Sequence, residues 1–113
     1  QAASITGEEV EEDGVYKTAA SARPEDIHSM VEKALSGDFI EARKILEILL
    51  IEGGVSGGDI IDQIYRSVWE FQVNNENAVL MIDRIGEAEY RISEGASERI
   101  QLEALLAAIS MKS

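Results

Sequence analysis

Glu25 and His28 are the pair best spaced for metal chemistry, three positions apart near the start of a predicted helix. This Glu-x-x-His spacing places a carboxylate and an imidazole on one helix face, as in di-iron helical bundles. Those centres need a second such pair, and His28 is the only histidine in the chain. We therefore expect His28 to be a solvated side chain and the chain to have no metal site.

The glycine-rich segment Gly53-Gly-Val-Ser-Gly-Gly-Asp59 is the second candidate for chemistry. Glycines let backbone N–H groups approach a phosphate where a helix begins. The segment lacks the Gly-Lys-Ser/Thr ending of a phosphate-binding loop, and no predicted strand precedes it. We interpret it as a turn between helices and expect no cofactor there.

Other catalytic groups find little support in the sequence. The absence of cysteine excludes thiolate nucleophiles, thiolate metal ligands and disulfides. The glutamates fall mostly on outward faces of predicted helices, where solvent surrounds them. No serine or threonine has a plausible base nearby, so we expect no catalytic residue.

Three aromatic residues, Tyr65, Trp69 and Phe71, are spaced so that they could form a platform for nucleic-acid bases. Only one basic residue, Arg66, is interleaved with them. The chain has 22 acidic and 10 basic residues, a net charge of −12, and five of the acids lie in Glu8 to Asp13. Such a surface repels a phosphate backbone, so direct nucleic-acid binding is not expected and Trp69 belongs to a core or an interface.

Five predicted helices position these residues. Proline suits a first helical position, glycine ends helices, and serine or aspartate caps them. The spacing of apolar residues predicts helices over 24–35, 39–51, 57–71, 76–94 and 98–111. Short loops predict an all-α five-helix bundle. The second helix, apolar almost all round, is expected to be the central one.

The last predicted helix carries two apolar stripes on opposite sides. One consists of Leu102, Leu105, Leu106 and Ile109, and the other of Ile100, Ala104, Ala107, Ala108 and Met111. Two stripes predict either burial between layers or a second surface reserved for another chain. Gln101 falls between Leu105 and Ala108. It is expected to be a buried amide bonded either within the bundle or to a neighbouring subunit.

The first 22 residues have too few apolar side chains for a core of their own. They are expected to be the end of a preceding domain, or a strap lying on the helices after residue 23. No apolar run reaches membrane-spanning length, which predicts a soluble chain.

Four separated segments resemble the C-terminal region of the small subunit of archaeal replication factor C, the sliding-clamp loader. They are Ala22-Arg-Pro-Glu-Asp-Ile27, Gly54-Val-Ser-Gly-Gly-Asp-Ile-Ile61, Arg84-Ile-Gly-Glu-Ala-Glu-Tyr-Arg-Ile92 and Glu94-Gly-Ala-Ser-Glu-Arg-Ile-Gln-Leu-Glu-Ala-Leu-Leu-Ala107. The resemblance runs from Gln1 to about Ala108, with the segments in the family's order. The acidic run Glu8 to Asp13 and the large side chain of Trp69 depart from the family's pattern.

The resemblance implies that residues 1–22 end the lid domain of an AAA+ ATPase module and that residues 23–113 form the helical collar, an oligomerisation domain. The family's nucleotide-binding lysine loop, acidic magnesium motif, arginine finger and lid arginine would all precede Gln1. ATP and magnesium would therefore belong to that missing module, and this fragment would be no enzyme. An archaeal protein of this kind would be cytoplasmic.

The implied function is association of clamp-loader subunits, both further copies of the small subunit and a large subunit. The full-length complex would use ATP to place a sliding clamp on primed DNA in DNA replication. The predicted subunit interface consists of Trp69, Ile100, Gln101, Ala104, Ala107, Ala108 and Met111. The alternative from another class is a stand-alone acidic helical adaptor that binds a partner protein.

Overall fold

The computed structural model describes residues 21–71 and 73–112. Chain order is α1 (Pro24–Leu35), α2 (Phe39–Glu47), the π-helical turn η1 (Ile48–Glu52), α3 (Gly57–Val68), α4 (Asn75–Ser93) and α5 (Glu98–Lys112). This part of the chain contains no strand, which confirms the predicted all-α five-helix bundle. None of its helices is long and apolar enough to cross a membrane.

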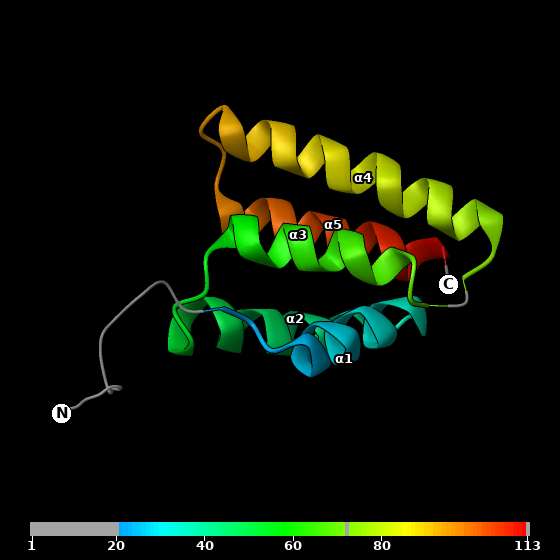
Figure 1. Cartoon of the computed structure of the whole chain (residues 1–113), viewed down its shortest axis with the longest axis horizontal. Helices are drawn as coiled ribbons and strands as arrows, with labels where there is room; N and C mark the ends of the chain where they lie inside the picture. Colours follow the sequence, from blue (N-terminus) through cyan, green and yellow to red (C-terminus); the bar gives the residue numbers. More distant parts are fainter. Residues whose placement is uncertain (1–20, 72, 113) are drawn as a thin grey trace, which may run out of the picture.

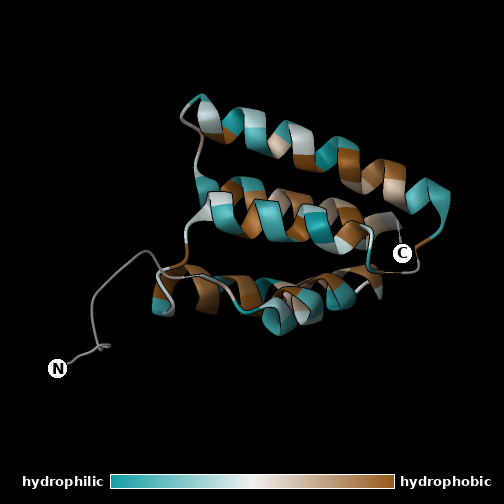
Figure 2. Cartoon of the chain, in the orientation of Figure 1, coloured by the Kyte–Doolittle hydropathy of each residue, from teal (hydrophilic) through white to brown (hydrophobic). Residues whose placement is uncertain are grey.

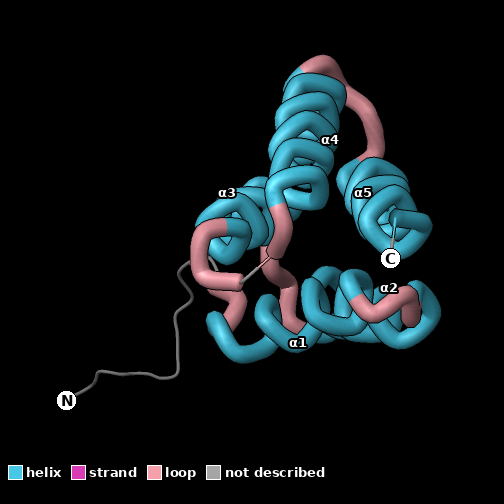
Figure 3. The backbone as a smooth tube through the Cα atoms, turned by 90° about the vertical axis from the view of Figure 1, so that its right-hand side faces the viewer, coloured by secondary structure: helices cyan, strands magenta, loops and turns pink. Residues whose placement is uncertain are grey.

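The helices form three levels, with α4 outermost on one side and the pair α1 and α2 on the other (Figure 1). The view along the bundle in Figure 3 shows α3 and α5 side by side between them, one beneath each flank of α4. Among the described helices, α5 alone packs extensively against all four others. The central helix is therefore α5.

The prediction that the second helix is the central one is wrong. Its apolar residues continue into η1 and cover most of this stretch (Figure 2). Only Ala42, Leu46 and Leu49 of α2 and η1 are buried, while Ile40 and Ile51 are 60% and 62% exposed. The reason is position: α2 lies at the edge of the bundle and, apart from η1, packs mainly against α1 and α5. A nearly all-round apolar pattern did not reveal that one side faces solvent.

The core takes side chains from all five helices and follows the predicted stripes in α1, α3 and α5. Its largest fully buried members are Ile27, Met30, Val31, Leu46, Ile60, Ile64, Val68, Met81, Leu102, Leu106 and Ile109. For α4, helical spacing predicts a buried stripe of Ala78, Val79, Ile82, Ile85 and Ile92. This stripe needs correction, because Met81 and Ala88 are buried whereas Val79 is 66% exposed. Since α4 packs mainly against α3 and α5, its buried face is narrower than the sequence pattern.

Predicted caps mark the helix ends. Gly37 has a φ of 89°, and Asp38 Oδ1 accepts from the Glu41 N–H at 3.2 Å. Ser56 Oγ accepts from the Asp59 N–H at 3.1 Å. Ser56 and Asp59 have the spacing of a reciprocal capping box, but only the bond to Ser56 forms. The Asp59 carboxylate instead accepts hydrogen bonds from Ala22 and Gln63.

Asp59 fixes the point where the chain enters the bundle. Its Oδ2 accepts from the Ala22 N–H at 3.1 Å and from Gln63 Nε2 at 3.2 Å, and Gln63 Nε2 also donates to the Ala22 oxygen at 2.9 Å. Ala22 is 5% exposed. Most of the segment predicted to end a lid domain, residues 1–20, lies outside the described residues, but its junction with the bundle is held against α3.

Candidate functional site: two apolar surfaces

One face of α5 is apolar and uncovered. We call Ile100, Ala104, Ala107 and Met111 the outer stripe. Ile100 is 63% and Met111 85% exposed, Ala104 is exposed, and Ala107 is half-buried. At about 100° per residue the outer stripe lies directly across the axis from the fully buried leucines. The chain therefore covers one predicted stripe of this helix and leaves the other open.

Ala108, which was grouped with this stripe in the sequence, is half-buried. It lies toward the α4 side of α5 in the helical projection, next to Gln101. It therefore marks the margin of the outer stripe.

An ion-pair cluster between α2 and α5 borders the outer stripe on one side. Arg99 Nε donates to Glu103 Oε2 at 3.2 Å, and its Nη2 donates to Glu47. Arg43 Nε donates to the same Glu103 oxygen at 3.2 Å. The hydrogen bond to Glu103 and the two nearby carboxylates raise the pKa of Arg99. These contacts fix the edge of α5 that faces α2.

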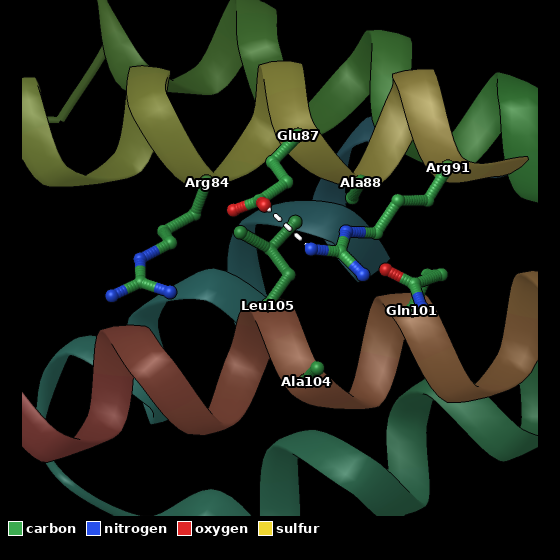
Figure 4. A pocket seen from close by; sticks show the side chains of 7 residues that line it. All are labelled: Arg84, Glu87, Ala88, Arg91, Gln101, Ala104 and Leu105. Atoms are coloured by element: carbon green, nitrogen blue, oxygen red, sulfur yellow. Dashed lines mark hydrogen bonds and ion pairs between the residues drawn. The ribbon is translucent and has the colours of Figure 1, made fainter.

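A small polar hollow of about 210 Å³ borders the stripe on the other side, between α4 and α5. Arg84, Glu87 and Arg91 reach into it from α4, and Gln101 and Ala104 line it from α5 (Figure 4). Arg91 Nη2 donates to Glu87 Oε2 at 2.8 Å. That hydrogen bond and the charge of Arg91 hold the pKa of Glu87 below its ordinary value.

The expectation that Gln101 is a buried amide bonded within the bundle is wrong, whereas its bonding to a neighbouring subunit stays a prediction. Its side chain is half-buried, lines the polar hollow, and makes no hydrogen bond with any described residue. The physical reason is the small size of its neighbours: Ala88 and Ala104 leave the α4–α5 boundary open at this point (Figure 4). Solvent can therefore satisfy the amide.

A second apolar surface lies between α3 and α4. Trp69, the residue that caps the C-terminal end of α3, is 66% exposed and packs edge-on against Tyr65, with ring centroids 6.3 Å apart. Trp69 lines a hollow of about 420 Å³ together with Ala78, Val79 and Ile82. We call Tyr65, Trp69, Ala78, Val79 and Ile82 the aromatic groove.

The aromatic groove includes residues that the sequence analysis did not assign to a surface. Helical spacing alone assigns Val79 and Ile82 to the buried stripe of α4, and Tyr65 to the buried stripe of α3. The exposure of Val79, only ten residues from the exposed Trp69, marks the groove in the structure. No sequence signal separates these two side chains from core residues, because their spacing is equally helical.

The aromatic platform that the spacing of Tyr65, Trp69 and Phe71 would allow, and that the sequence did not favour, is not formed. Phe71 turns toward α1, where its ring lies 5.1 Å from that of His28, away from the edge-on pair of Tyr65 and Trp69. His28 also bonds to Glu70, which lies outside the Glu-x-x-His pair. Within the described residues, no group of three or more His, Cys, Asp or Glu side chains is placed to hold a metal ion.

The glycine-rich segment binds a carboxylate of the chain itself, that of Glu98. The Gly57 N–H at the start of α3 donates to Glu98 Oε1 at 3.1 Å. A Cβ at Gly57 would lie 2.8 Å from the side chain of Glu98, which explains the glycine. The helix start that invited a phosphate interpretation thus receives a carboxylate from α5, and the segment serves as an inter-helix turn.

Comparison with known proteins gives one consistent result. The family "Replication factor C C-terminal domain" matches residues 22–108. A replication factor C small subunit from Halobacterium salinarum is 59% identical over 111 residues, which cover 98% of this chain and 34% of the relative. Small subunits from Haloarcula marismortui and Archaeoglobus fulgidus are 53% and 43% identical, each over 97% of this chain and 34% of the relative. The chain thus spans about a third of the length of these relatives.

Proposed function

The chain belongs to the replication factor C family and carries its C-terminal domain, and we propose that this domain joins clamp-loader subunits to one another. The supporting observation is a pair of different apolar surfaces on one bundle. The helix α5, which carries the outer stripe, and the helix α3, whose C-terminal cap is Trp69 of the aromatic groove, lie on opposite flanks of α4 (Figure 3).

Two unlike surfaces favour head-to-tail association. When the surface of one subunit binds a different surface on the next, repetition closes a ring if the rotation between neighbours permits it. The alanines of the outer stripe let a neighbouring helix approach closely. Trp69 is a large, exposed anchor of the type that dominates interface energetics. We therefore propose that the outer stripe of one subunit covers the aromatic groove of the next.

For the whole protein, we propose loading of a sliding clamp onto primed DNA with the use of ATP. Because the chain spans about a third of its relatives, we assign ATP, magnesium and DNA contacts to the remainder of such a protein. We assign to this domain no catalytic, cofactor-binding or metal-binding residue. Its proposed partners are further small subunits and a large subunit, in the cytoplasm of an archaeon.

Co-assembly tests this proposal. A full-length small subunit that contains this chain should form mixed oligomers with the isolated chain, detected by size exclusion with light scattering. An excess of the isolated chain should inhibit clamp loading by occupying subunit contacts. Separate elution of the two proteins at all concentrations would contradict the proposal.

The acidic adaptor remains as an alternative because the net charge is −12. Raised salt separates the two functions. Association through apolar surfaces persists at high ionic strength, whereas an adaptor held by surface charge dissociates from its partner.

A further inference from the structure

Two carboxylates at the rim of the aromatic groove lack a counter-charge. Asp62 of α3 and Glu89 of α4 line a common hollow of about 240 Å³, together with Tyr65, Ile82 and Gly86. Both carboxylates are exposed, and neither forms an ion pair or hydrogen bond within the described part of the chain. Like charges on facing walls of one hollow disfavour each other unless a cation lies between them.

Arg84, whose guanidinium has one long ion pair with a described residue, borders the outer stripe. Arg84 reaches into the polar hollow beside Ala104 of the outer stripe (Figure 4). Its single ion pair with a described residue is a 4.0 Å contact between its Nε and Asp83 Oδ2. Arg91, by contrast, is occupied by Glu87 at 2.8 Å. Arg84 therefore has donors free for a carboxylate from outside the chain.

These groups cannot meet within one chain. Glu89 and Arg84 are five residues apart on α4, about 140° around the helix axis, and they border different surfaces. In a contact between the outer stripe of one copy and the aromatic groove of another, Arg84 would border the first surface, and Asp62 and Glu89 would border the second. An arginine can bind carboxylates through several N–H donors in fixed directions, which favours one docking geometry.

The overall charge opposes association, so a contact between opposite charges would offset part of the repulsion. Two copies that each carry a net charge of −12 repel each other. The hollow with Arg84 and Arg91 holds one carboxylate against two guanidinium groups, whereas the charged residues of the hollow beside Tyr65 are both acidic. The two borders of the proposed contact are thus locally complementary even though the chains are not.

We propose that Arg84 of one copy binds between Asp62 and Glu89 of the next copy and thereby fixes the register of the subunit contact. This inference rests on the proposed function, since it presupposes that the outer stripe meets the aromatic groove. It adds the charged residues that select one alignment of two otherwise apolar surfaces.

Charge reversal followed by mixing tests the pairing. The variants are Arg84→Glu, and a double variant with Asp62→Lys and Glu89→Lys. Lys44→Glu is the matched control, because Lys44 is exposed on α2 and pairs only with Glu41. Each test variant alone should associate at least about tenfold more weakly than the wild type in sedimentation experiments at low salt. An equimolar mixture should regain most of the association, because alternating copies then have two favourable contacts: one pairs the new glutamate with the two new lysines, and the other pairs the unchanged Arg84 with the unchanged Asp62 and Glu89.

The outcomes separate this inference from the proposed function. Circular dichroism and urea midpoints establish that each variant is folded. If the wild type associates and Arg84→Glu behaves like Lys44→Glu, or if mixing restores nothing, the charge pairing is wrong while association stands. If the wild-type chain stays monomeric at millimolar concentration and fails to join full-length subunits, both proposals are wrong.

Discussion

Leu102 and Ile100 lie two residues apart on α5 and face opposite sides of it: Leu102 is fully buried and Ile100 is 63% exposed. Both side chains are large and aliphatic, and helical spacing alone does not say which of their two stripes enters the core. The bundle covers one of them and leaves the other to solvent. The central helix α5 therefore has one face in the core and an uncovered apolar surface on the opposite face.

The two residues should respond differently to truncation. Leu102→Ala should lower the free energy of unfolding by about 2–5 kcal/mol, because it leaves a cavity in the core. Ile100→Ala should change it by less than about 0.5 kcal/mol in dilute solution, because solvent already surrounds that side chain. Urea denaturation at low protein concentration measures both. Equal losses would contradict the placement of the two stripes.

Trp69 offers a direct optical probe, since it is the only tryptophan. Its emission should shift to shorter wavelength as protein concentration rises, because a neighbouring subunit would remove the ring from water. Trp69→Ala should weaken association by about 2 kcal/mol or more, as expected for an aromatic anchor. Tyr90→Ala is the control, since Tyr90 is 65% exposed and lines neither the hollow beside Trp69 nor the hollow between Asp62 and Glu89. Equal behaviour of the two variants would exclude the aromatic groove as an interface.

The sequence predicted the number and order of the helices and most of their limits, because caps and glycine stops are local signals. The predicted ends at 51 and 71 need correction, since α2 ends at Glu47, just before η1, and α3 ends at Val68. Asp38 and Ser56 act as caps through hydrogen bonds within four residues, which spacing alone can indicate. The position of a helix within the bundle is not local. The exposure of Ile40 and Ile51 follows from α2 lying at the edge, and apolar composition contains no signal for it.

Gln101→Ala separates a stabilising role from an interface role. The amide has no hydrogen-bond partner among the described residues, so the free energy of unfolding should stay within about 0.5 kcal/mol of the wild type. Association should weaken by about 1 kcal/mol if a neighbouring subunit binds the amide. Thermal unfolding and sedimentation equilibrium measure the two effects separately. A large loss of stability would show that the amide supports the bundle itself.

Acid titration should report the Glu87–Arg91 pair. The hydrogen bond and charge of Arg91 lower the pKa of Glu87 in the folded chain. A lowered folded-state pKa adds stability at pH values above the unfolded-state pKa, and this contribution disappears as pH falls through the folded-state pKa. In Arg91→Gln, the carboxyl of Glu87 should therefore titrate at higher pH than in the wild type. Carbon NMR of the side-chain carboxyl measures this, and an unchanged midpoint would contradict the assignment.

The candidate surfaces were predicted in part. Two opposite stripes on the last helix follow from helical geometry, and the structure leaves Ile100 and Met111 exposed as that pattern allows. Of the aromatic groove only Trp69 was predicted as an interface residue, because Trp69, at the end of α3, and Val79, on α4, line one hollow only in the folded bundle. Spacing along one helix gives no information about which of its neighbours stands beside it.

The most direct test of the central claim is the molar mass of the chain and of Ala104→Arg as a function of concentration, by size exclusion with light scattering. Ala104 is exposed at the middle of the outer stripe, so arginine there should leave helix content unchanged while blocking close approach of a neighbour. The account predicts a mass above that of the monomer for the wild type, retained at high salt, and a monomer for the variant. A strictly monomeric wild type, or equal oligomers of both proteins, would contradict it.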